Sequence, residues 1–363
     1  MLAGAAPAIT ASAAEPPLGI TCSSCLVVAE DGRRLFARAA EVPLPNASTT
    51  KMMTAIVVLS SADLDDEVVV SPGAAAVPGG KLGLLAGERW SVHELLQALL
   101  VASSNDAAVA LAEHVAGSET SFVEVMNRRA ARLGLEATSF TTSHGLDAEG
   151  HSSSAADLAT LAAELLDSPV LAEIVDTSGT TIESSERAAT IENTNLLLET
   201  YPGADGVKTG FTALAGNVLV ASAERDGRRL IAVAMHSADA FTDAAALLDF
   251  GFRKLRRGIL LADETVQDAI VSDAGAVSAV AAQTVRGPEL PESVRFSFQV
   301  SPGLSLPIRE GEVIGLIHVE DEDGGILDSV PATSSGSLSA PPVDWRRELI
   351  EDVLAAAGHL LGE

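Results

Sequence analysis

A serine and a lysine three residues apart, Ser48 and Lys51, are the residues of this 363-residue chain whose types and spacing most directly suggest chemistry. Pro43 and Pro45 keep the preceding chain extended, and the apolar run 52–59 then predicts a buried helix. At this spacing both side chains lie on one helix face. A lysine that loses its proton through burial can activate the serine hydroxyl as a nucleophile. Because a serine at a helix start is more often only a cap, the pair alone does not establish a catalytic site.

A second candidate site lies in a turn between two apolar helices predicted at 92–101 and 107–115. Ser103 and Asn105 stand in this turn, two residues apart, so both side chains could project into one cleft. The alternative is that Asn105 simply opens the second helix as a capping residue. By itself this motif therefore leaves a structural role open.

A third candidate site is the run Lys208-Thr209-Gly210, which the pattern places on a strand at the edge of a sheet. Its neighbours 217–223 and 230–235 alternate as an antiparallel hairpin around a turn at 225–227. On such a strand a cation and a hydroxyl would face a cleft, and the glycine would let a substrate backbone approach closely.

The elements that must position these groups are helices around an antiparallel sheet, which predicts an α+β fold. Ser91 and Glu94 form a capping box that starts the helix before Ser103. The Pro/Gly-rich stretch 71–87 predicts an exposed loop with a short strand near 81–83. The other strands are predicted at 19–29, 33–38 and 67–70.

The three motifs in this order, S-x-x-K, S-x-N and K-T-G, resemble the motif set of the penicillin-binding proteins and serine β-lactamases. From about residue 18 to 255 the chain is similar to the low-molecular-mass D-alanyl-D-alanine carboxypeptidases. Where that family usually has Gly-His-x-Ser-Thr, this chain has Ser154 in place of the threonine. The segments that carry the similarity between the motifs are Gly145-Leu146-Asp147, Gly150-His151, Asn193-Thr194-Asn195 and Tyr201-Pro202-Gly203.

The resemblance implies a catalytic domain of the penicillin-binding-protein and β-lactamase type, with an antiparallel sheet flanked by helices. Within it, Ser48 would be the acyl-accepting nucleophile and Lys51 its base, although the identity of the base is disputed in this superfamily. Ser103 would relay a proton to the leaving D-alanine. Lys51 would be kept neutral by burial and by the positive charge of Lys208.

The remaining motif residues would bind the substrate. Asn105 would hold a substrate amide, Lys208 would stay charged, and Thr209 would bind the terminal carboxylate. Gly210 completes this motif, and the amides of Ser48 and Phe211 would form the oxyanion hole. These groups need neither a metal nor a cofactor.

The implied activity is removal of the terminal D-alanine from peptidoglycan stem pentapeptides, with β-lactam antibiotics such as penicillins as inhibitors. A D,D-endopeptidase acting on cross-linked peptidoglycan would use the same chemistry. A class A β-lactamase would need a Glu-x-x-x-Asn motif between the second and third sites, whereas Glu192 and Asn193 are adjacent. A non-catalytic homologue would lack one of the motif residues, and all of them are present.

The predicted organisation has five parts. Residues 1–17 are a signal-like or disordered leader that ends in small residues but lacks a basic start, and they predict export to the periplasm or cell-wall side. The peptidase domain at 18–257 is followed by a small β-rich domain at 258–331 and a Ser/Pro/Ala linker at 332–343. The segment 344–363 predicts an amphipathic helix that would contact a membrane surface or dock on protein.

Composition limits the other possibilities. A net charge of −27 excludes a general nucleic-acid-binding protein, and 47% hydrophobic residues indicate a globular chain. Cys22 and Cys25 form a C-x-x-C without a second pair of ligands nearby, so a structural zinc site is not expected. They would form a local disulfide or remain two free thiols.

Overall fold

The computed structural model describes residues 19–225, 227–256, 259–260, 265–272, 275–281, 285–286, 295–302, 304–320 and 325–339. The chain divides into two compact units, Met1–Phe252 and Arg253–Glu363. This division falls inside helix α9 (Ala240–Arg256), a few residues before the boundary predicted after 257. The predicted leader at 1–17 and C-terminal helix at 344–363 lie outside the described residues.

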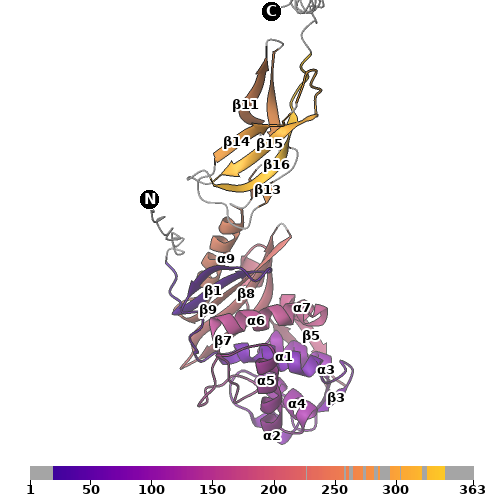
Figure 1. Ribbon diagram of the computed structural model, residues 1–363. Helices are drawn as coiled ribbons and strands as arrows, with labels where there is room; N and C mark the ends of the chain where they lie inside the picture. The colour runs from indigo at the N-terminus through magenta and orange to yellow at the C-terminus, as the bar shows by residue number, and fades with distance from the viewer. Residues whose placement is uncertain are drawn as a thin grey trace, which may run out of the picture. The chain divides into compact units, whose positions relative to one another are not determined.

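A five-stranded antiparallel sheet with the order β2-β1-β9-β8-β7 is the framework of the first unit (Figure 1). Side chains alternate between its faces. Leu26 and its cross-strand partner Val233 belong to the core shared with the helices. Val27 points to the other face, where a Cβ on Gly251 of α9 would lie only 2.8 Å from it. The strands are β1 (Ser24–Ala29), β2 (Arg34–Arg38), β7 (Ala204–Thr212), β8 (Gly216–Arg225) and β9 (Arg228–Ser237).

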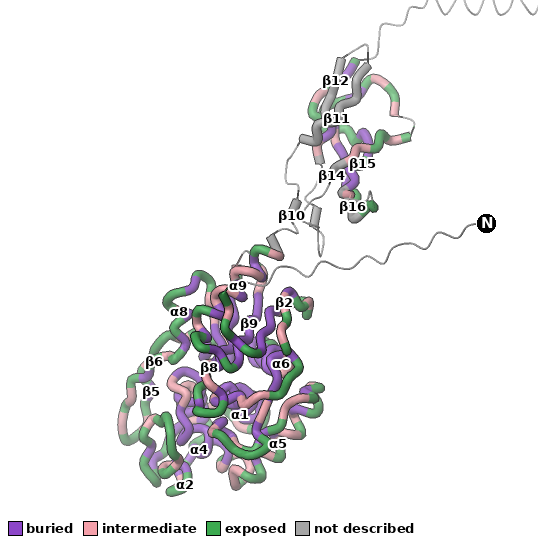
Figure 2. The backbone as a smooth tube through the Cα atoms, turned by 90° about the vertical axis from the view of Figure 1, so that its left-hand side faces the viewer, coloured by how far each residue is buried: buried purple, intermediate pink, exposed green. Residues whose placement is uncertain are grey.

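Helix α1 (Lys51–Leu59) lies at the centre of the helical part and contacts α3, α4, α5 and α6. The predicted buried helix is confirmed, because every residue of α1 except Leu59 is buried (Figure 2). The other helices are η1 (Ala47–Thr50), α2 (Pro72–Ala76), α3 (Val92–Leu100), α4 (Asn105–Ala116), α5 (Glu119–Arg132), α6 (Ala155–Leu166), α7 (Pro169–Asp176) and α8 (Leu197–Thr200). Two small two-stranded antiparallel sheets complete the unit, one of β3 (Glu67–Val69) and β4 (Arg89–Ser91) and one of β5 (Gly179–Glu183) and β6 (Ala188–Glu192).

Local signals in the sequence explain several of these elements. The capping box of Ser91 and Glu94 is present at the start of α3. The β1–β2 and β8–β9 hairpins form as expected, and β7 is the edge strand predicted for the K-T-G motif. Cys22 and Cys25 are joined in a disulfide, which settles the choice between a disulfide and two thiols.

The segment 71–87 differs in two ways from the exposed loop with a short strand that the sequence predicts. Ser71 caps the short helix α2, with Pro72 at its first position, a signal that the sequence contained. The short strand predicted at 81–83 is wrong. The backbone amides of Leu82 and Gly83 donate hydrogen bonds to the carboxylate of Asp106, so they are not available for a strand partner.

The second unit is the expected β-rich domain. Its main sheet is antiparallel with the order β11-β12-β16-β15-β14, and β10 pairs with β13. The strands are β10 (Ile259–Leu260), β11 (Thr265–Ser272), β12 (Gly275–Ala281), β13 (Val285–Arg286), β14 (Arg295–Val300), β15 (Val313–Glu320) and β16 (Ile326–Ser334).

The linker predicted at 332–343 is wrong over its described part. Strand β16 continues to Ser334, and Leu338 is buried and pairs with Ile308. Small residues misled the composition argument, because Ala332 and Ser334 alternate as inward-facing positions of a strand. Within the described ranges, no helix combines the length and the apolar composition needed to cross a membrane.

Candidate active site

Ser48 and Lys51 stand where η1 passes into α1, and their side chains meet as predicted. Lys51 Nζ lies 2.8 Å from Ser48 Oγ, 2.7 Å from Asn105 Oδ1 and 2.8 Å from the carbonyl oxygen of His144. The lysine side chain is completely buried. The first two motifs therefore form one hydrogen-bonded group, although 54 residues separate Lys51 from Asn105.

The bonding partners define what Lys51 does when it is neutral. The side-chain nitrogen of Asn105, Nδ2, donates to the carbonyl of Pro78 at 2.8 Å, so the side-chain oxygen of Asn105 faces Lys51. Asn105 Oδ1 and the His144 carbonyl can only accept, and together they take both N–H groups of a neutral amine. The nitrogen lone pair is then left for the hydroxyl of Ser48, which is the arrangement a general base requires.

Electrostatics favour this neutral form. Burial holds the pKa of Lys51 well below its usual value, and the positive charge of Lys208 lowers it further. The carboxylate of Asp106 opposes this shift. No ion pair among the described residues neutralises Lys51 through direct contact, so loss of its proton is the route that relieves the cost of burial.

The backbone before Ser48 is held in an unusual conformation. Ala47 has a φ of 48°, in the left-handed region that a residue with a side chain seldom adopts. The hydroxyl of Thr50 donates to the Ala47 carbonyl at 2.8 Å. Gly145 packs against the same carbonyl so closely that a Cβ there would lie 1.9 Å from the oxygen. These contacts fix the direction of the Ser48 amide.

His151 supports this arrangement as a neutral donor. Its Nδ1 accepts a hydrogen bond from the amide of Thr141 at 3.0 Å, so the ring proton is on Nε2. Nε2 lies 2.7 Å from the hydroxyl oxygen of Thr50. Burial lowers the pKa of His151 to about 4, which keeps the ring uncharged at neutral pH.

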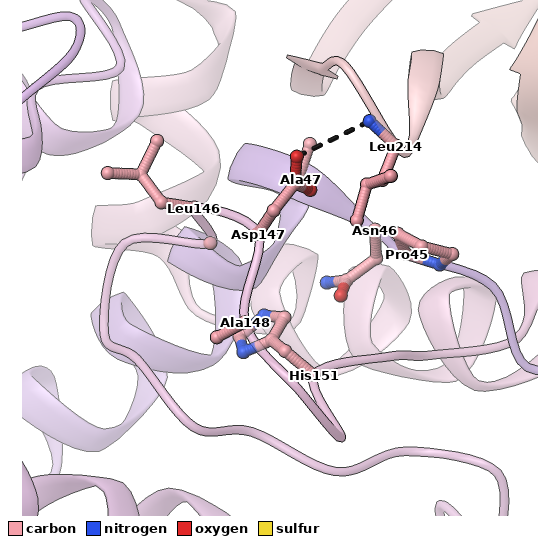
Figure 3. A pocket seen from close by; sticks show the side chains of 9 residues that line it. Pro45, Asn46, Ala47, Leu146, Asp147, Ala148, His151 and Leu214 are labelled. Carbon is pink, nitrogen blue, oxygen red and sulfur yellow. Dashed lines mark hydrogen bonds between the residues drawn. The ribbon is translucent and has the colours of Figure 1, made fainter.

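A small pocket with an empty volume of about 210 Å³ borders this backbone but does not include the Ser48–Lys51 pair (Figure 3). Asn46, Asp147 and Leu214 are among the residues that line it. Asp147 accepts from the hydroxyl of Thr212 at 2.6 Å and from the amide of Leu214 at 3.3 Å. The segment that follows Gly145 is thereby tied to the end of β7.

The third motif lies on β7, next to η1. A Cβ on Gly210 would lie 3.0 Å from the amide nitrogen of Ser48. The glycine is therefore needed for the approach of the chain's own η1 backbone, not only for the substrate backbone to which the sequence argument assigned it. Phe211, whose amide is the second predicted oxyanion donor, is the next residue of β7, and its side chain is exposed.

Lys208 is buried, and its ammonium nitrogen lies 3.2 Å from the carbonyl of Thr209. Burial lowers the pKa of Lys208 to about 7. Burial thus opposes the charged form that the sequence argument assigns to Lys208, and its charge in the working site stays a prediction. An anion bound against it would restore the charge.

Ser103 stands in the turn between α3 and α4 with a φ of 59°, another strained position. The residue is half-buried, and none of the residues that the structure describes hydrogen-bonds to its hydroxyl. Within the described part of the chain, Asn105 therefore contacts Lys51, whereas Ser103 hydrogen-bonds to neither of them. Its hydroxyl is available for a proton-transfer role.

Asp106 is a residue whose importance the sequence argument missed. It is completely buried, and its carboxylate accepts from the amides of Leu82, Gly83 and Leu84 at 2.8–3.0 Å. The same loop contacts Asn105, because the backbone N–H of Asn105 donates a hydrogen bond to the Gly80 carbonyl at 2.8 Å. Asp106 thus holds the loop that orients Asn105, and no spacing in the sequence indicated this.

We expect Asp106→Asn to lower the free energy of unfolding by about 1–3 kcal/mol, because one amide N–H of the loop would face a donor in place of an acceptor. Urea unfolding followed by circular dichroism measures the change. Asp65→Asn, at an exposed position, is the matched control and should unfold like the wild type. Equal stability of the Asp106 variant would contradict the role of this carboxylate.

Comparison with known proteins places these features in a family. A family model described as D-alanyl-D-alanine carboxypeptidase matches residues 10–239. The D-alanyl-D-alanine carboxypeptidase DacF of Bacillus subtilis is 32% identical over an alignment of 333 residues that covers 87% of this chain and 85% of that protein.

Solved structures agree on the fold. The D-alanyl-D-alanine carboxypeptidase DacD from Francisella tularensis has a TM-score of 0.66 and 23% identity, and covers 92% of this chain and 97% of its own, which supports the fold of both units. The Streptomyces K15 DD-transpeptidase has a TM-score of 0.62 and 30% identity, and covers 64% of this chain and 98% of its own.

Proposed function

The chain belongs to the D-alanyl-D-alanine carboxypeptidase family of serine peptidases, and we propose that it removes the terminal D-alanine from peptidoglycan stem pentapeptides through an acyl-enzyme on Ser48. The observation that carries this proposal is the position of Lys51 Nζ, 2.8 Å from Ser48 Oγ. Its two other contacts are to groups that can only accept. A serine with a buried, deprotonated amine beside it has the activation that peptide-bond attack requires.

Acylation begins when Lys51 takes the proton of Ser48 and the oxygen attacks the carbonyl between the two D-alanine residues. The amides of Ser48 and Phe211 stabilise the oxyanion of the tetrahedral intermediate. Collapse breaks the peptide bond, and the proton that Lys51 took passes through the hydroxyl of Ser103 to the departing amine, so that Lys51 is neutral again and Ser103 keeps its proton. Water then hydrolyses the ester, which releases the shortened peptide and returns the proton to Ser48.

Substrate binding depends on the C-terminal carboxylate. Lys208 provides the cation and Thr209 a hydroxyl, while Asn105 contributes the amide hydrogen that its bond to Pro78 leaves unused. A carboxylate that approaches Lys208 stabilises its charged form and so restores the charge that burial weakens in the free protein.

This role of Lys208 predicts a pH dependence. Its ammonium form is the acid form, so kcat/KM for a substrate with a free carboxylate should fall as pH rises through the pKa of about 7 in the free enzyme. In Lys208→Arg the guanidinium stays protonated, and this fall should be absent. Steady-state D-alanine release measured across pH tests this. The same alkaline midpoint in both proteins would argue against Lys208 as the titrating group.

β-Lactam antibiotics should act as inhibitors, because Ser48 would open the strained amide of the lactam ring and form an ester. The carboxylate that penicillins carry would occupy the position of the substrate carboxylate near Lys208 and Thr209. Acylation by such compounds therefore reports on the same catalytic groups as the peptide reaction.

The substrate class implies a location outside the cytoplasm, on the periplasmic or cell-wall side. The buried disulfide between Cys22 and Cys25 supports export, because disulfides persist mainly in oxidising compartments. We further propose that the segment 344–363 makes peripheral contact with a membrane. Binding of the full chain and of a chain ending at residue 343 to anionic vesicles would separate this from a helix that docks on protein.

The proposed function is tested by incubating the purified protein with a stem pentapeptide and measuring free D-alanine. Release by the wild type and its loss in Ser48→Ala are expected. A cross-linked muropeptide tests the endopeptidase alternative, and an added acceptor amine tests transfer, as the similarity to a DD-transpeptidase warrants. Absence of D-alanine release from the pentapeptide would overturn the carboxypeptidase assignment.

A further inference from the structure

The segment Asn193-Thr194-Asn195 has no role in the reaction described so far, yet it is fixed at several points beside the site. The amide of Thr194 donates to the carbonyl of Val101 at 3.2 Å, two residues before Ser103. Asn195 Nδ2 donates to the carbonyl of Gly206 on β7 at 2.9 Å. The segment therefore connects the turn that carries Ser103 to the strand that carries the K-T-G motif.

Asn193 fixes the other side of the segment. Its Nδ2 donates to the carbonyl of Thr177 at 2.8 Å, and its Oδ1 accepts from the amide of Asn195 at 2.9 Å. Both asparagine side chains are thus committed to the backbone. Thr194, between them, is the member of the three whose side chain faces the K-T-G motif.

The hydroxyl oxygens of Thr194 and Thr209 lie 2.6 Å apart. Thr194 is exposed and Thr209 is half-buried, so solvent or a ligand can reach the pair. Each hydroxyl has one proton, and in the free protein one of the two is used within the pair. Both protons can turn outward when an anion arrives, since the pair is not sealed in the core.

A carboxylate presents two oxygens that accept several hydrogen bonds, and bonds to charged acceptors are stronger than neutral ones. In the proposed site, Thr209 supplies one hydroxyl that can donate to the substrate carboxylate. We propose that Thr194 is a second carboxylate-binding residue, whose hydroxyl donates to the C-terminal carboxylate of the D-alanyl-D-alanine substrate together with Thr209. This inference rests on the proposed carboxypeptidase function and adds a specificity-determining residue to it.

The test compares Thr194→Val, which removes the hydroxyl at nearly constant shape, with Thr194→Ser, which keeps it. The chain also offers a matched control in Thr181, whose hydroxyl lies 3.1 Å from that of Thr190 on the β5–β6 hairpin. Thr181 is exposed like Thr194, and Thr181→Val removes a hydroxyl from a threonine pair that does not include a residue of the K-T-G motif. Each protein is assayed with a D-alanyl-D-alanine pentapeptide, and its acylation by benzylpenicillin and by the benzylpenicillin methyl ester is followed.

For the pentapeptide, Thr194→Val should lower kcat/KM by about 10- to 100-fold, the size expected for one hydrogen bond to a charged group. Most of the change should appear in KM, because the carboxylate is bound in both the ground state and the transition state. Thr194→Ser should retain activity within about threefold of the wild type, and Thr181→Val should be unchanged. Acylation by the methyl ester should be unaffected in Thr194→Val, since the ester carries no anion.

Wild-type kinetics in Thr194→Val would overturn the inference, as would an equal loss with benzylpenicillin and its methyl ester or a failure of Thr194→Ser to restore activity. These outcomes differ from failure of the proposed function, which would appear as a wild-type protein that releases no D-alanine. The wild-type assay is therefore read first.

Discussion

Replacing Lys51 with methionine is expected to lower kcat/KM for D-alanine release by about a thousandfold or more, the scale of a lost general base. The reason lies in the bonding of its amine. Both N–H groups of the neutral form are taken by Asn105 Oδ1 and the His144 carbonyl, so the lone pair is directed at Ser48. Methionine fills the same volume without that lone pair, and the serine hydroxyl is left unactivated.

The fold should survive this change. Methionine leaves two buried acceptors without their donor, which costs stability, but it also removes a buried amine whose charged form is strongly desolvated. Because these effects oppose each other, a cooperative thermal transition close to that of the wild type is expected. An unfolded variant would make the kinetic result uninformative, so calorimetry accompanies the assay and Lys51→Arg serves as the second variant.

Lys51→Arg should also be inactive, because a guanidinium stays protonated at any accessible pH and cannot accept the serine proton. Retained activity in a folded Lys51→Arg or Lys51→Met protein would contradict the assignment of Lys51 as the base. Activity in both would show that another group activates Ser48.

The second large effect is expected for Gly145→Ala. A Cβ at this position would lie 1.9 Å from the oxygen and 2.5 Å from the carbon of the Ala47 carbonyl, and φ is 91°. The backbone before Ser48 would have to move, which should cost about 3 kcal/mol of folding free energy and displace the oxyanion-binding amide. Acylation should therefore be lost even in the molecules that remain folded.

Gly150→Ala is the matched control, because Gly150 lies in the same segment with a φ of 76° but no atom within 4 Å of its Cβ position. It should cost only the conformational strain of about 1–2 kcal/mol and leave acylation intact. Urea unfolding and the rate of penicillin acylation provide the two measurements. Similar behaviour of the two variants would show that the contact with Ala47 does not matter.

Much of the site could be predicted from the sequence because its signals are local or are shared within the family. The apolar run after Lys51 indicates a buried helix, and the capping box at Ser91 and Glu94 marks a helix start. The alternating strands after Lys208 indicate a hairpin and hence an edge strand beside it. Each of these three signals can be recognised from a few residues that are close together in the sequence.

The parts that could not be predicted depend on contacts between distant residues. Asp106 accepts from amides more than 20 residues away, so the loop at 81–83 could not be identified as a non-strand from its own composition. The close approach of Gly210 to Ser48 likewise depends on how β7 packs on η1. The pKa of Lys208 depends on the depth of its burial, which no local pattern reports.

Composition also misled at one point. The stretch after Val330 is rich in serine, alanine and threonine, as linkers often are, but its small side chains are the inward-facing residues of β16. Strand and linker differ here only in whether neighbouring strands are available for pairing, and β15 and β12 provide them.

The central claim is that Ser48, activated by Lys51, carries the acyl group. It is tested most directly by incubating the protein with benzylpenicillin and locating the covalent adduct by mass spectrometry of the digested protein. We predict one adduct per chain, on the peptide that contains Ser48, and none in Ser48→Ala or Lys51→Met. An adduct on another residue, or an unchanged yield in Ser48→Ala, would contradict it.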